Sequence, residues 1–241
     1  MPIQTGLPEQ LTWIDDVNRG DHSFLTKEDR CAFFGELQAS TGWGGGATNQ
    51  LIANFKRSPA QIGREPCGER LRRHRERAIN EVAAALRSQF TREEVELRCT
   101  FVPLPTSKQP GHPEYCDRLE RSLRLAFAGY RADIRPLLQL AASTRADHLS
   151  AVERLRYQHL LALTSLDVRQ LAGELRPMVV LFDDVLASGK HYRVAKTRIR
   201  EVFPGQGILG IFVARRALRS SCRRPASLAA TRGSRPPVSA R

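Results

Sequence analysis

Apolar residues in the second half of the chain form patterns that alternate between strand and helix. The run Val179–Phe182 is apolar throughout. Because it lacks the alternation of a half-exposed strand, it predicts a parallel strand buried on both faces. After Gly189, apolar residues recur about every 3.6 positions, which predicts an amphipathic helix. Similar patterns predict further strands at 97–104, 134–140 (interrupted at Pro136) and 207–214, and helices at 114–128 and 152–163. Alternating strands and helices indicate an α/β fold, with a parallel sheet flanked by helices.

The first ninety residues show a different pattern. Phe33, Phe34 and Leu37 stand at short helical spacing, and Thr48 or Asn49 is expected to cap a short helix. A strong amphipathic stripe comes next, made of Leu71, Ala78, Val82, Leu86 and Phe90. We therefore expect three regions, which are a mainly helical N-terminal extension at 1–92, an α/β domain at 95–216 and a basic tail at 217–241.

Composition and charge narrow the function classes. The chain has 241 residues, of which 41% are apolar, enough for one substantial core. Its net charge of +13 is concentrated at the end, where eight arginines and no acid follow Ala214. We expect that tail to be disordered. We expect nucleic acid to bind only through this tail, by non-specific electrostatic attraction. No run approaches the ~18 apolar residues of a membrane helix, so we expect no membrane partner. The N-terminus lacks a signal-peptide pattern and the five cysteines lack metal or redox spacing, so a cytoplasmic protein is expected.

Two adjacent carboxylates and a short turn come directly after the buried strand. Asp183 and Asp184 lead into Ala187-Ser188-Gly189-Lys190 at the start of the predicted helix. Open α/β sheets bind ligands at the carboxyl ends of their strands, and the amides at a helix start can hold an anion. Paired carboxylates beside such an anion site suit a ligand with both hydroxyls and a phosphate.

A second loop with candidate chemistry ends the strand at 97–104. Pro103 and Pro105 stiffen the chain, and a hydroxyl pair and a lysine stand next at Thr106, Ser107 and Lys108. A rigid turn that presents these groups suits a pyrophosphate. Taken alone, such a segment is more often an ordinary loop without a binding role. Here it precedes the two aspartates in the sequence, and this order supports a binding role.

These two segments resemble the binding motifs of type I phosphoribosyltransferases, and the proline loop is most similar to that of the competence protein F-like members. The resemblance implies the parallel-sheet fold of that family. It implies that Asp183 and Asp184 contact the ribose hydroxyls and meet Mg²⁺, the expected cofactor, only indirectly through the ribose-bound ion. These two aspartates and Lys108 are the implied catalytic residues. The implied contacts to the 5-phosphate are Ala187, Ser188, Gly189, Lys190 and His191, and those to the pyrophosphate are Thr106, Ser107, Lys108 and Arg118.

The implied function is transfer of a phosphoribosyl group from phosphoribosyl pyrophosphate, or binding of a related ribose phosphate, in nucleotide metabolism. The acceptor nitrogen stays unidentified, and a homodimer stays open. Ala187 and His191 stand where the family usually has hydroxyl residues. This motivates an alternative, a catalytically silent module that binds a nucleotide or sugar phosphate for regulation. A buried strand with an ordinary polar turn, as in many α/β domains, is the remaining and less favoured alternative.

Overall fold

The computed structural model describes residues 7–38, 46–106, 108–140, 160–162, 164–167 and 173–217. The strands are β1 Thr12–Trp13, β2 Arg30–Gln38, β3 Cys99–Pro103, β4 Asp133–Ile134, β5 Leu138–Leu140, β6 Thr164–Leu166, β7 Met178–Leu186 and β8 Gly207–Ala217. The α-helices are α1 Ala47–Lys56, α2 Pro59–Gly63, α3 Gly68–Arg87, α4 Arg118–Ala126 and α7 Lys190–Val202. A 3-10 turn η1 covers Arg19–Asp21, and a π-helical turn η3 covers Glu94–Arg98.

A mostly parallel six-stranded sheet organises the chain. Its order is β1-β2-β8-β7-β3-β4, and every neighbouring pair is parallel except β1 with β2. A second, two-stranded sheet pairs β5 with β6. The expected α/β class with a parallel sheet flanked by helices is therefore confirmed. β7, which carries the two aspartates, lies in the interior of the larger sheet, between β8 and β3.

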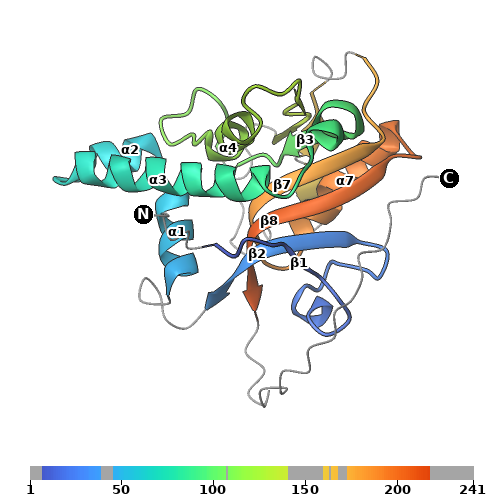
Figure 1. Cartoon of the computed structure of the whole chain (residues 1–241), viewed down its shortest axis with the longest axis horizontal. Helices are drawn as coiled ribbons and strands as arrows, with labels where there is room; N and C mark the ends of the chain where they lie inside the picture. Colours follow the sequence, from blue (N-terminus) through green and yellow to red (C-terminus); the bar gives the residue numbers. More distant parts are fainter. Residues whose placement is uncertain are drawn as a thin grey trace.

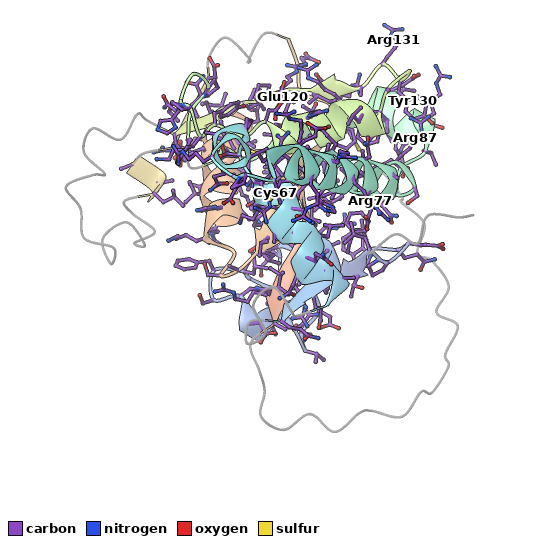
Figure 2. All side chains as sticks on the ribbon, turned by 90° about the vertical axis from the view of Figure 1, so that its left-hand side faces the viewer. Cys67, Arg77, Arg87, Glu120, Tyr130 and Arg131 are labelled. Carbon is purple, nitrogen blue, oxygen red and sulfur yellow. The ribbon has the colours of Figure 1, made fainter. Side chains whose placement is uncertain are left out.

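Helices cover both faces of the sheet, which explains why β7 is apolar without alternation (Figure 1). Val180 and Phe182 join the core formed with α1, α3 and α4, whereas Val179 and Leu181 join the core formed with α7. The C-terminal end of α3 is bonded to the C-terminal end of α4 through Arg87. There Arg87 donates to the Ala126 carbonyl at 2.8 Å. The guanidinium of Arg87 also lies 4.4 Å from the ring centre of Tyr130 (Figure 2).

The helical spacing expected around Phe33 and Phe34 is wrong, because these residues belong to β2. In that strand the two rings face opposite cores, Phe34 toward α3 and Phe33 toward α7. β2 pairs with β8 from Arg30 to Gln38, so the chain before residue 95 contributes to the main sheet and to both cores. Helices do dominate this region after β2, as the stripe that includes Leu86 predicts.

The expected cap of the first helix is also wrong. Gly46 stands at the N-cap of α1, and Thr48 and Asn49 lie inside the helix. The Asn49 side chain instead bonds both backbone groups of Gln38, at 3.0 and 3.1 Å, and ties α1 to the end of β2. The helix packs closely there, since a Cβ on Gly35 would lie 2.8 Å from the Thr48 side chain.

The remaining elements keep the predicted order with shifted bounds. The segment at 134–140 splits around Pro136 into β4 and β5, which belong to different sheets. Of the helix expected at 152–163, only 160–162 are described in full, and they are helical. Ser107 and the basic tail beyond Ala217 lie outside the described residues. No helix within the described ranges combines the length and the apolar character needed to cross a bilayer.

Candidate functional site

The two predicted loops meet at one edge of the sheet. β3 and β7 are parallel neighbours, with Pro103 opposite Phe182, and the Leu104 amide donates to the Phe182 carbonyl at 2.9 Å. The proline loop, residues Pro103–Lys108, therefore begins beside Asp183 and Asp184. Carboxyl ends of adjacent parallel strands are where such sheets bind ligands, so the arrangement forms a candidate binding site.

Asp184 is a buried carboxylate with two cationic partners. Its Oδ2 accepts from the Arg118 guanidinium, with Nε at 3.0 Å and Nη2 also in contact, and its Oδ1 accepts from Lys56 Nζ at 3.2 Å. Arg118 begins α4 and Lys56 ends α1. Burial alone would raise the pKa of Asp184, but the charges and hydrogen bonds of Arg118 and Lys56 outweigh it and lower that pKa. Asp184 is therefore ionised near neutral pH.

Asp183 is also buried but has the opposite electrostatic character. Alternation along β7 directs it to the face covered by α7, away from Arg118 and Lys56. Its Oδ1 accepts the Asp184 amide at 2.7 Å. Burial, and then the charge of Asp184, raise the pKa of Asp183 to about 7. Two adjacent carboxyl groups thus differ in protonation, a division that is common in sites which handle charge or protons.

The Ser-Gly turn, residues Ala187–His191, follows β7 and includes the first two residues of α7. Gly189 has φ +80° and forms the N-cap of α7, and a Cβ there would lie 2.8 Å from Leu25. Glycine is therefore required by both backbone conformation and space. Among the described residues, the amides of Ser188 and Gly189 donate to no other group. They stand beside the start of a helix, whose own first amides favour an anion.

Two basic side chains belong to this turn. Lys190 is buried, and burial lowers the pKa of its ammonium group. His191 lies at the surface, where partial exclusion of water and the Lys190 charge lower the pKa of its imidazole.

The proline loop borders a cavity of about 420 Å³. Thr106 Oγ1 donates to the Lys108 carbonyl at 2.9 Å and closes the loop, and Lys108 is an exposed residue in the cavity wall. The cavity is also lined by Asp117 and Leu119, the sequence neighbours of Arg118 at the start of α4. This volume is within the range of small-molecule sites.

A smaller cavity of about 20 Å³ connects the proline loop to the Ser-Gly turn. It is lined by His191 together with Leu104 and Pro105, and both of the latter also line the larger cavity. It has room for about one water molecule. The proline loop therefore forms a wall shared by the two spaces.

Most of the predicted site residues that the structure describes gather in this region. Arg118 contacts Asp184 directly. Sequence reasoning missed Lys56, whose position at the end of an ordinary short helix gives no chemical signal.

Neither the family models nor the curated proteins with which the chain was compared match it. Within the described ranges, no group of three or more His, Cys, Asp or Glu side chains is arranged to hold a metal ion.

Proposed function

We propose that the chain binds phosphoribosyl pyrophosphate at this edge of the sheet and transfers the phosphoribosyl group to a nitrogen acceptor. The observation that carries the proposal is the junction of β3 and β7, where the proline loop lies beside Asp183 and Asp184 and the Ser-Gly turn comes next. Ribose hydroxyls would meet the aspartates, the 5-phosphate would meet residues 187–191, and pyrophosphate would meet the proline loop and Arg118.

The charges around the site support a polyanionic ligand. Lys56 and Arg118 are both committed to Asp184, and Lys108 stands at the cavity wall. An arriving pyrophosphate would compete with Asp184 for Arg118, and the ribose hydroxyls would replace the lost donor on the carboxylate. This exchange keeps every buried charge paired as the ligand enters, which avoids the cost of an uncompensated buried ion.

The direct carboxylate ligation of magnesium does not fit this arrangement. Asp184 is held by Arg118 and Lys56, and Asp183 retains a proton up to about neutral pH. A magnesium ion would instead be held by the pyrophosphate and ribose hydroxyls of the ligand, and it would supply charge neutralisation of the leaving group.

The residues of the chain would act by electrostatics and position. Departure of pyrophosphate leaves positive charge on the sugar, as in other glycosyl transfers. Asp184, freed from Arg118, would stabilise that charge. Asp183 would form a hydrogen bond with a ribose hydroxyl, either as donor or as acceptor. Lys108 and Arg118 would neutralise the departing pyrophosphate.

Calorimetric titration of the intact chain with phosphoribosyl pyrophosphate and Mg²⁺ tests the proposal. We expect binding, and we expect Asp183→Asn with Asp184→Asn to remove most of the affinity. The exposed pair Asp15 and Asp16 offers a matched control, since the double Asn variant there should bind like the unaltered protein. Absence of binding by the folded, unaltered chain would refute the proposal.

The second candidate is a binding module without turnover. It is favoured by Ala187 and His191, which supply no hydroxyl to the turn. It predicts ligand binding without pyrophosphate release across a panel of bases and amines. Steady pyrophosphate release with any acceptor would exclude it.

A further inference from the structure

A segment near the N-terminus holds the Ser-Gly turn from one side. The Nδ1 atom of His22 contacts the Ala187 carbonyl, and the Phe24 amide donates to the Ser188 carbonyl at 2.9 Å. Leu25 packs against Gly189. These residues lie more than 160 positions before the turn in sequence.

Salt bridges fix this segment to the rest of the sheet. Asp21 pairs with Arg215 of β8 at 2.8 Å. Asp29, whose side chain is fully buried, contacts the ammonium of Lys196 in α7. The segment is therefore anchored on both sides of His22, to the sheet and to the helix that the turn begins.

The two carbonyl contacts orient two amides. A trans peptide unit is planar, and its C=O and N–H point in opposite directions. When His22 holds the Ala187 carbonyl, the Ser188 amide in the same peptide plane must point away from the N-terminal segment. The bond from Phe24 to the Ser188 carbonyl directs the Gly189 amide away in the same manner. Both amides lack a partner among the described residues.

Packing alone does not account for a histidine at position 22. The ring is 1% exposed, and its Nε2 has no partner within the described parts of the chain. A buried polar atom without a partner costs free energy that an apolar side chain would avoid. Burial also lowers the pKa of His22, so the ring is neutral, and the nitrogen facing a carbonyl must carry the proton. Within the part of the chain that the structure describes, the hydrogen bond of this ring is therefore the one to Ala187.

We propose that His22 is a positioning residue for the anion site, because its Nδ1–H holds the Ala187 carbonyl aside and turns the Ser188 amide toward a bound phosphate group. This inference rests on the proposed function only in that the Ser-Gly turn receives a phosphate. It assigns to the N-terminal region a part in the site that neither sequence motif contains.

The test compares three substitutions at one position. Asn places an amide donor close to where Nδ1 stands, Gln places one close to Nε2, and Leu removes the donor. His74, exposed on α3, provides the control His74→Leu. Amide signals of the isotope-labelled intact chain are followed by NMR during titration with inorganic phosphate and, separately, with phosphoribosyl pyrophosphate and Mg²⁺.

We expect phosphate to shift the Ser188 and Gly189 amide signals in the unaltered chain. His22→Leu should weaken phosphate binding about tenfold, and His22→Asn should stay within about threefold of the unaltered protein. Equal affinity of His22→Leu and the unaltered protein, or equal losses in His22→Asn and His22→Gln, would overturn the proposal. If His22→Leu does not fold, the comparison of Asn with Gln decides alone.

The same titrations separate this inference from the proposed function. If phosphate shifts both amides and depends on His22, but phosphoribosyl pyrophosphate with Mg²⁺ binds no better than phosphate, the transferase proposal fails and the role of His22 stands. If phosphoribosyl pyrophosphate binds equally well to the unaltered and His22→Leu chains, the role of His22 fails alone. Binding of neither ligand removes both.

Discussion

Replacing Asp183 by asparagine should stabilise the protein at neutral and alkaline pH. The pKa of this carboxyl is raised from 3.8 to about 7, first by burial and then by the charge of Asp184. Between these values the unfolded chain is ionised at this position while the native protein keeps the proton. The native state therefore binds more protons than the unfolded state, so its free energy of unfolding falls as pH rises through this window. Asparagine does not ionise, and its side-chain oxygen can still accept the Asp184 amide.

The size of the effect comes from the two pKa values. At 1.36 kcal/mol per pKa unit, a rise from 3.8 to about 7 corresponds to ~4 kcal/mol. Part of this comes from the charge of Asp184, which structural relaxation partly screens. We therefore expect Asp183→Asn to be about 2–4 kcal/mol more stable than the unaltered chain above pH 7. The difference should shrink toward zero near pH 4.

Urea unfolding followed by circular dichroism between pH 4 and 8 measures this difference. Asp184→Asn is the matched control with the opposite sign. It loses both cationic partners and should be destabilised by about 3 kcal/mol at neutral pH. That loss should stay nearly constant between pH 4 and 8 and diminish only at lower pH, because the pKa of Asp184 lies below its ordinary value of 3.8. A stability difference for Asp183→Asn that is equal at pH 4 and pH 8, or a destabilised variant at pH 8, would refute the reasoning.

Two further substitutions test the framework around the site. Gly189→Ala should lose about 1–3 kcal/mol because of its φ of +80° and the 2.8 Å approach to Leu25. Gly205→Ala, where a Cβ meets nothing within 4 Å, is the control in the same unfolding assay, and equal stabilities would contradict the argument. Asp29→Asn should cost about 3–5 kcal/mol in free energy of unfolding because it leaves buried Lys196 uncompensated. A loss below about 1 kcal/mol would show that this pair is not anchored as described.

The interior of the sheet could be predicted because burial on both faces leaves a direct record in the sequence. β7 shows it as the uninterrupted apolar run Val179–Phe182 before Asp183. β2 is also buried on both faces, yet the helical interpretation of Phe33 and Phe34 was wrong. Two adjacent aromatic residues followed by Leu37 fit a helical stripe as well as a strand, and periodicity over so short a window cannot separate the two. The pairing with β8, which decides the matter, joins residues far apart in the chain.

The candidate site was likewise predictable from the sequence only in part. The meeting of the aspartates with the proline loop was predictable, since both come after strands of one parallel sheet and such strands end at a common edge. Lys56 and His22 were not, because each reaches the site across more than 120 residues from a region without a chemical pattern of its own. Yet Lys56 helps to keep Asp184 ionised, and His22 holds a carbonyl of the Ser-Gly turn. The motif therefore identifies the groups that would face the proposed ligand, whereas their charge and orientation depend on the N-terminal part of the chain.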